Sequence, residues 1–234
     1  MHRRCSPVAF ALTALLALPG CGPTVDPAAK ADLDRRLAAL PASSETYPPS
    51  EAFLPMPFVP GQWTQHSVRG GDKTPPQLLT YKLVGQDDGG YWLEIVTDSY
   101  YGHEVAKMHV FMLRGREPSG MEIRALRVKK GNSAPADVDL TGDEAARNRY
   151  RQALDLLAVS FEGKEKDDAR VPGGHFVGCW KTRTPVPWGP WQSPSLLCAH
   201  PSVPLSGIVM AEPVGGGPRM ELVAFGSSGM ESEL

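Results

Sequence analysis

Apolar side chains recur at every second position through most of the chain beyond residue 60, and this alternation limits the possible fold more than any other feature. Leu79, Tyr81 and Leu83 alternate before the turn-forming run at 85–90, and a second alternating arm follows that run. A period of two belongs to strands with one buried face, and glycine-rich turns between such strands are typical of antiparallel hairpins. The pattern predicts nine strands, at 62–69, 77–84, 91–97, 104–114, 121–129, 175–181, 195–200, 205–212 and 219–225.

Two of these strands carry more detailed expectations. The alternation in 121–129 slips near Ala125 and Leu126, which indicates a β-bulge. In the last strand, Met220, Leu222 and Ala224 are expected to share one face.

One main helix is predicted between the strands. Thr141, with Glu144 three residues later, forms a capping-box pattern. A helix over 147–161 would place four large apolar side chains on one face, those of Tyr150, Leu154, Leu157 and Phe161. The sequence therefore predicts an α+β domain at residues 61–234, in which this helix packs on a large curved antiparallel sheet.

Composition and charge exclude several other classes. The chain has 24 glycines and 23 prolines among 234 residues, too many for a helical bundle or a coiled coil. Its 41% of hydrophobic residues is too high for a disordered protein. The formal net charge of −2 gives no general attraction to nucleic acid, so no nucleic-acid partner is expected.

The first twenty residues have the pattern of an export signal. Arg3 and Arg4 precede an apolar run from Val8 to Leu18, which is too short to span a bilayer comfortably and ends at small residues. Residues 1–20 are therefore predicted to be a signal peptide, although an ordinary secretory peptide with an incidental cysteine would also carry these features.

The segment Leu18-Pro19-Gly20-Cys21 resembles the lipobox of bacterial lipoproteins. This resemblance implies that Cys21 is acylated and becomes the first residue of the mature protein. Several acyl chains on one residue form a nearly permanent membrane anchor. Gly22 stands where many lipoproteins retained at the inner membrane have Asp, so the resemblance implies an outer-membrane location, with the domain facing the periplasm.

Residues 21–60 are rich in proline and predict a semi-extended tether. Within it, Asp26 can cap a short helix that has Pro27 at its first position and ends at Pro41. Leu33, Leu37 and Leu40 would lie on one face of this helix, which is expected to pack on the domain.

The overall layout, from lipobox through tether to a meander of strands wrapped on a helix, resembles the half-barrel of lipoprotein-localisation (Lol-type) carriers. In that family an apolar cavity on the concave face of the sheet holds acyl chains beneath a helical lid. The resemblance implies an apolar ligand site whose wall includes Tyr81, Met108 and Met112. A filled core would produce the same alternation.

Cys179 and Cys198 form an even pair in a chain predicted to be exported, which favours a disulfide between two neighbouring strands. By strand parity His175 and His200 would share their face, so a zinc site is an alternative. The spacing lacks the tight turns that usually supply zinc ligands, and we expect no metal and no cofactor.

Motifs for catalysis are weak throughout the chain. Asp137, Asp139 and Gly142 resemble the start of a calcium loop, but Asn148 stands where a bidentate Glu is needed. His66 and His109 are isolated, and we find no nucleophile elbow, P-loop or dinucleotide-binding motif. A non-enzymatic role is therefore expected, with a hydrolase as the less favoured alternative.

The segment 184–194 holds Trp188 and Trp191 among four prolines. A stiff loop with two rigid aromatic rings could contact a membrane, a glycan or a protein partner, or its rings could fold back over the sheet edge. The sequence thus leaves two main hypotheses, a lipid-anchored periplasmic protein that holds an apolar ligand such as an acyl chain, and a structural or interaction lipoprotein that binds a protein or glycan through this loop.

Overall fold

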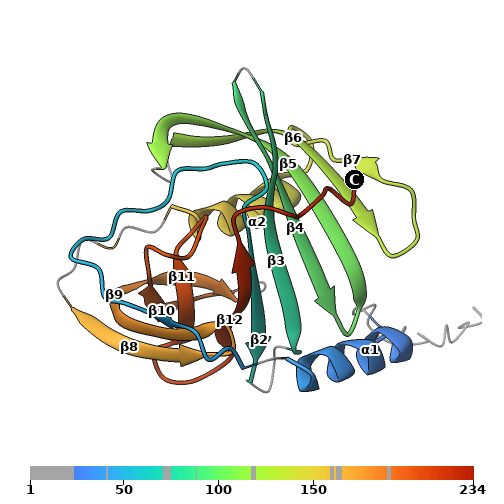
Figure 1. Cartoon of the computed structure of the whole chain (residues 1–234). Coiled ribbons are helices and arrows are strands. Elements are labelled where there is room, and N and C mark those ends of the chain that lie inside the picture. Colours follow the sequence, from blue (N-terminus) through green and yellow to red (C-terminus); the bar gives the residue numbers. More distant parts are fainter. Residues whose placement is uncertain are drawn as a thin grey trace, which may run out of the picture.

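The computed structural model describes residues 24–40, 42–70, 75–87, 89–116, 120–158, 161, 165–188 and 191–234. These residues form one open, mixed β-sheet of twelve strands with two α-helices (Figure 1). The predicted signal peptide and Cys21 lie outside the described residues. Within the described residues no helix is both long and apolar enough to cross a membrane.

The strands follow the order β1-β9-β10-β11-β12-β2-β3-β4-β5-β6-β7, and β8 pairs with β9 outside this path. All pairings are antiparallel except that of β1 with β9, which is parallel. The elements are α1 (Pro27–Ala38), β1 (Thr46–Tyr47), β2 (Trp63–Arg69), β3 (Gln77–Asp87), β4 (Gly90–Ser99), β5 (Gly102–Arg116), β6 (Met121–Lys130), β7 (Ala136–Asp137), α2 (Glu144–Asp155), β8 (Lys166–Val171), β9 (Gly174–Trp188), β10 (Trp191–Ala199), β11 (Ile208–Pro213) and β12 (Arg219–Gly226).

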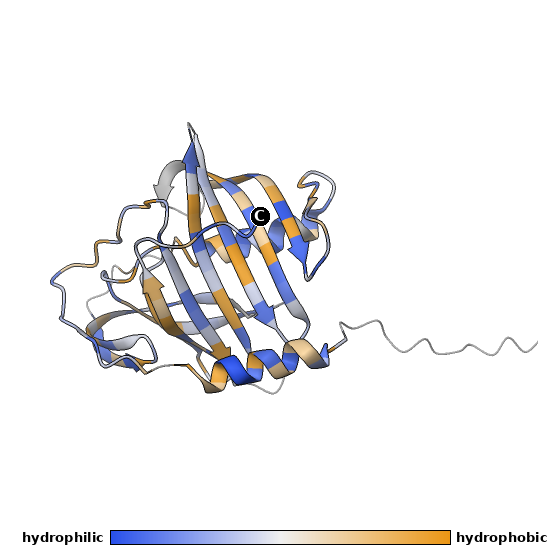
Figure 2. Ribbon diagram, turned by 45° about the vertical axis from the view of Figure 1, so that its right-hand side comes forward, coloured by the Kyte–Doolittle hydropathy of each residue, from blue (hydrophilic) through white to orange (hydrophobic). Residues whose placement is uncertain are grey.

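Helix α2 covers the face of β3–β6 that we call the inner face. Alternate residues of these strands, among them Leu83, Leu93 and Met108, form one core cluster with Leu154 and Leu157. The alternation is visible as bands of hydropathy along the strands in Figure 2. Tyr150 and Leu154 lie on the buried side of this helix, but α2 ends at Asp155, so the predicted helix as far as residue 161 is wrong. Leu157 and Phe161 are buried in the segment that follows the helix.

The start of α2 differs from the prediction. The helix begins at Glu144, so Thr141 lies two residues before the N-cap position. The Thr141 hydroxyl donates instead to Asp139 Oδ1, at 2.6 Å. Because the helix starts only at Glu144, Thr141 is not its N-cap residue, and the predicted capping box is wrong.

Helix α1 confirms its prediction closely. The side chain of Asp26 accepts hydrogen bonds from the backbone N–H groups of Ala28 and Ala29, and Pro27 occupies the first turn. Leu33 and Leu37 are buried against Leu78 and Val223. The helix therefore lies against the sheet, across the ends of β3–β5 in Figure 1.

The segment between α1 and residue 60 also contacts the sheet. Thr46 and Tyr47 add a short strand beside β9, and Phe53 packs against Phe161. The division at residue 60 between tether and domain remains a prediction, but much of the described chain before it is part of the packed structure.

The opposite, outer face of β3–β5 is covered by the C-terminal residues, which cross it in Figure 1. There Lys82 and Glu94 are cross-strand partners, and their side chains are only 5% and 0% exposed. Lys82 Nζ lies 3.2 Å from Glu94 Oε1 and 2.5 Å from Glu233 Oε1. Ser232 Oγ donates to Glu94 Oε2 at 2.8 Å, so this carboxylate is well satisfied although buried.

All nine predicted strands are present, and three were missed. The charged run at 166–168 enters β8, which pairs with β9, and β1 and β7 have only two residues each. The sheet is mixed because β1 is parallel to β9. Both expected helices are present, but each has twelve residues, so neither is a single main helix.

A bulge in β6 is confirmed at Arg124, next to the predicted position, since His109 pairs with Ala125 and Val110 with Ile123. A second bulge, at Val223 in β12, was not predicted. It turns Ala224 toward α1 rather than to the face of Met220, so the expectation of one shared face is wrong at Ala224.

We predict that Leu33→Ala will lower the free energy of unfolding by about 2–4 kcal/mol, because it leaves a cavity between α1 and the sheet. Denaturant unfolding would measure the change. Arg35→Ala, on the exposed side of the same helix, should change stability by less than about 0.5 kcal/mol. Equal effects of the two variants would show that α1 is not packed as described.

Candidate functional site

A cavity of about 200 Å³ lies between α2 and the inner face of the sheet. Its walls come from β2, β3, β4, β5, β9 and β12, and α2 forms its roof. The apolar and aromatic side chains that line it are those of Val68, Leu79, Tyr81, Ile95, Tyr150, Ala153, Leu156, Val186 and Met220.

Polar side chains also line this cavity, namely Gln77, Thr97, Glu104, Arg149 and Gln152. The Tyr150 hydroxyl donates to Glu104 Oε1 at 3.0 Å, and Lys130 Nζ lies 3.4 Å from Glu104 Oε2. The cavity therefore combines apolar walls with a few fixed polar groups, as small-molecule sites usually do.

Two phenols in the cavity wall remain neutral at physiological pH. Burial raises the pKa of Tyr81 to about 12. Burial, and after it the charge of Glu104, raises the pKa of Tyr150 above its usual value. Both side chains thus offer hydroxyl groups rather than charges to anything bound there.

Of the three side chains predicted to line an apolar site, only that of Tyr81 lines this cavity. Met108 is fully buried in the core cluster of the inner face. Met112 lines a separate space of only about 10 Å³, beside Leu154 and Leu157, which is too small for a ligand.

The polar part of the cavity was missed by the sequence analysis. Strand parity places Glu104 on the same face as Ala106, and Arg149 directly precedes Tyr150. Parity alone could have identified Glu104, but nothing local indicates that α2 would bring Arg149 to the same cavity.

The segment 184–194 was expected to be a loop, but its described residues are the paired ends of two strands. β9 runs to Trp188 and β10 starts at Trp191, and the two residues pair in register. The side chains of both tryptophans lie outside the described part of the structure, so their proposed contact role remains a prediction.

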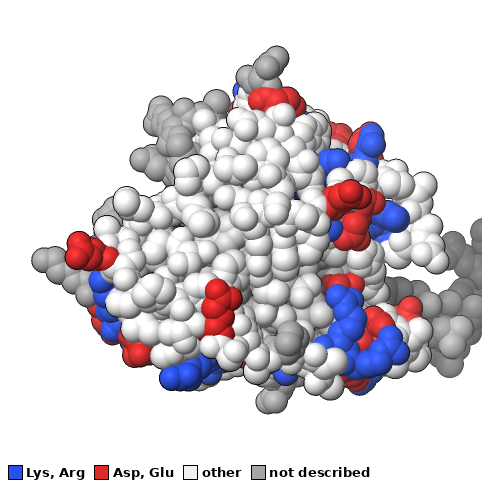
Figure 3. All heavy atoms as spheres, viewed as in Figure 1, with Lys and Arg blue, Asp and Glu red and all other residues white. Residues whose placement is uncertain are grey.

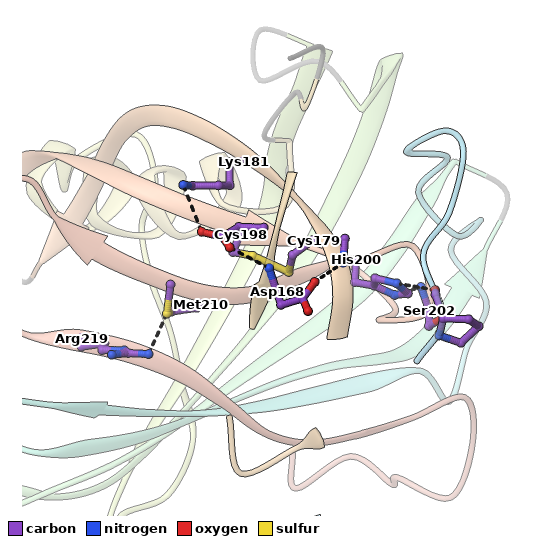
Figure 4. Close-up of a disulfide and its surroundings, with 11 residues drawn as sticks. Asp168, Cys179, Lys181, Cys198, His200, Ser202, Met210 and Arg219 are labelled. Atoms are coloured by element: carbon purple, nitrogen blue, oxygen red, sulfur yellow. Dashed lines mark hydrogen bonds and ion pairs between the residues drawn. A yellow bond between two sulfur atoms is a disulfide. The ribbon is translucent and has the colours of Figure 1, made fainter. Parts of the chain in front are cut away.

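The predicted disulfide is confirmed between Cys179 of β9 and Cys198 of β10 (Figure 4). The Cα atoms lie 5.5 Å apart, and both residues are buried. The two cysteines are not directly opposite, because Cys198 pairs with Lys181. The bond is therefore diagonal across the two strands.

This bond removes the thiolates that the zinc alternative needs. His200 donates from Nε2 to the carbonyl of Pro48 at 3.0 Å, and His175 Nε2 lies 3.6 Å from Asp168 Oδ2. In the possible calcium loop, Asp137 pairs with Arg127 at 2.8 Å. Over the described residues no group of three or more potential metal ligands is present.

His66 lies on β2, only 1% exposed. Its Nε2–H donates to the carbonyl of Ile208 at 3.0 Å, which leaves Nδ1 as a buried acceptor with no hydrogen-bond partner among the described residues. Burial lowers the pKa of His66 to about 4. The ring is therefore neutral at physiological pH and packs in the protein interior.

No protein-family model, no curated protein and no solved structure matches this chain.

We predict that stability falls in mild acid because of His66. Between pH 6.5 and 4 the unfolded chain binds a proton at this residue and the folded protein does not, so stability present above pH 6.5 is lost as the pH falls. The free energy of unfolding should drop by up to about 1.4 kcal/mol per pH unit in this range.

The matched variant is His66→Gln, whose side-chain amide can still donate to Ile208 but does not titrate. Unfolding measured from pH 7.5 to 4.5 should show a weaker pH dependence for this variant. Parallel curves for the two proteins would contradict the prediction.

Proposed function

We propose that this protein is a non-enzymatic, lipid-anchored protein of the cell envelope that holds an apolar ligand, such as an acyl chain, between its sheet and α2. The observation that supports this most directly is the cavity beneath α2, which has apolar walls and polar groups beside them. An amphipathic ligand needs both kinds of surface.

The volume of about 200 Å³ is below the ~300 Å³ at which ligand pockets usually begin. A long chain would therefore have to displace α2, and the helix is suited to this. Ala153 is the small side chain on its cavity-facing side, and Leu154, with Leu157 just beyond the end of the helix, packs on the sheet. A twelve-residue helix is marginal without such packing, so α2 can act as a lid that moves when a ligand competes for the same surface.

The open, curved sheet is compatible with the half-barrel expected from the layout, in which strands wrap around the ligand and a helix closes the opening. The disulfide fits the oxidising periplasm that the predicted signal and lipobox imply. The location proposed here is the periplasmic side of the outer membrane.

We predict that the purified protein will release lipid on organic extraction and bind a fluorescent fatty acid saturably. Ala153→Phe places a large ring in the cavity and should weaken that binding at least about tenfold, which corresponds to 1.4 kcal/mol. Mass spectrometry of the extract and fluorescence titration would measure the two effects.

Asn148→Phe is the control, because Asn148 is an exposed residue of the same helix and does not line this cavity. It should bind like the unmodified protein. If the extract contains no lipid and no saturable binding is measured, the proposal is rejected in favour of an interaction protein with a filled core. Turnover of esters that is lost in Glu104→Gln would indicate a hydrolase instead.

The proposed anchor has its own test. Cys21→Ser should shift the protein from the membrane fraction to the soluble periplasmic fraction, because the acyl chains can no longer be attached. Cys5→Ser is the matched control, since Cys5 lies in the predicted signal peptide and should leave anchoring unchanged. A Cys21→Ser protein that remains on the membrane would contradict the anchor.

A further inference from the structure

A second pocket, of about 340 Å³, lies on the outer face of the sheet and is separate from the cavity beneath α2. Its lining includes Val84, Gly85, Trp92, Lys107, Arg127 and Asp137. The pocket falls within the size range of small-molecule sites. It lies beside the C-terminal residues that cross this face, since Leu234 also contributes to its wall.

The indole of Trp92 is held in one orientation. Its Nε1–H donates to Asp87 Oδ2 at 3.0 Å. The imidazole of His109 stacks on the indole, with ring centroids 4.4 Å apart and an angle of 7° between the planes. His109 is itself fixed by Asp87 Oδ1, which lies 2.9 Å from Nε2. One carboxylate thus orients both rings, and a preorganised ring loses little entropy when a ligand binds.

Because His109 covers one side of the indole and does not line the pocket, the surface that Trp92 gives to the pocket is a fixed aromatic wall. Gly85 extends this wall with its backbone alone. A Cβ atom at this position would lie 3.5 Å from Trp92 Cδ1, in van der Waals contact with the indole.

Hydrogen-bond donors and an acceptor lie near this wall. Arg127 binds Asp137 through Nε and Nη2, at 2.8 and 3.2 Å, and within the described residues its Nη1 group makes no hydrogen bond. Lys107 Nζ lies 5.7 Å from the centre of the Trp92 ring and donates to Ser232 Oγ and to the Leu234 carbonyl, each at 3.0 Å. The C-terminal residues therefore position Lys107 at the pocket.

Two β-bulges adjoin the pocket. One is at Val84, since Leu83 pairs with Leu93 but Gly85 pairs with Trp92, and the other is at Arg124 in β6. Bulges redirect side chains and occur often beside functional sites. Here Val84, Gly85 and Ala125 of the two bulged segments all line the pocket.

We infer that this outer pocket binds a saccharide, with one sugar ring lying against Trp92 and its hydroxyl groups hydrogen-bonded to Lys107, Arg127 and Asp137. A sugar ring has an apolar face of C–H groups that suits an aromatic wall. Its hydroxyls both donate and accept, which matches a pocket with two cationic donors and one carboxylate acceptor.

The test uses the purified protein and a panel of neutral and acidic mono- and disaccharides, with the indole N–H signals followed by NMR. The Trp92 signal, assigned by its loss in Trp92→Phe, should shift saturably with at least one sugar. Trp92→Ala and Arg127→Gln should each weaken that binding about tenfold or more, and Trp92→Phe should weaken it less because an aromatic wall remains.

Two controls separate the pocket from general effects. Trp180→Phe changes a tryptophan that does not line this pocket, and Arg219→Gln changes an exposed arginine of β12 that pairs with Glu221. Both should bind as the unmodified protein does. Arg127 is an exposed side chain, so its variant keeps the test valid if Trp92→Ala fails to fold.

The absence of a saturable shift up to about 10 mM of every sugar would overturn the inference, since even weak specific binding saturates near that concentration. Binding that survives both Trp92→Ala and Arg127→Gln would also overturn it, as would binding of free indole or another planar aromatic compound in place of the sugars. This test is independent of the proposed acyl-chain site. Ala153→Phe alters only the cavity beneath α2 and should leave sugar binding unchanged.

Discussion

The structure depends first on covering the inner face of β3–β6. That face carries large apolar side chains on every strand, and much of it is covered by α2 with Leu154 and by Leu157, which follows the helix. Each such side chain contributes roughly 1.5–3 kcal/mol when fully buried. Because α2 has only twelve residues, it is a helix mainly while it lies on the sheet. The cavity beside Ala153 exists because a small residue faces the sheet there, where the neighbouring positions carry larger side chains.

The outer face of the same strands is covered by different means. Lys82 and Glu94 would be unremarkable on an exposed sheet surface, but Ser232 and Glu233 close over them. A buried ion pair is stable only when its remaining hydrogen-bonding capacity is met. Glu94 accepts hydrogen bonds from Lys82, from the Ser232 hydroxyl and from the backbone N–H of Glu233. Glu233 Oε2 in turn lies 3.1 Å from His103 Nε2. In the view of Figure 3, charged side chains gather near the C-terminal end and over α1, whereas much of the rest is uncharged.

Features set by neighbouring residues could be predicted from the sequence. The cap at Asp26, the face of α1 and the hairpin of β3 and β4 each follow from residues close together in the chain. β8 could not be predicted, because its charged residues tolerate an edge position beside β9 that only the tertiary structure provides. The cavity could not be predicted either, because it forms only where α2 and β12 meet, and some 70 residues separate Tyr150 from Met220 in the sequence. The bulge at Val223 reverses the side-chain alternation through a backbone change with no local signal.

Strand β4 serves both proposed sites through the simple alternation of its residues. Ile95 and Thr97 face the cavity beneath α2, while Trp92 and Glu94 face the opposite side. In a regular sheet both faces near β4 would be flat, and side chains of neighbouring strands would stand in parallel rows. The bulges at Val84 and Arg124 break these rows only toward the end of the hairpin where Trp92 lies. The inner face keeps its regular packing around Leu83 and Leu93, so the pocket on the outer face is formed without opening the core behind it.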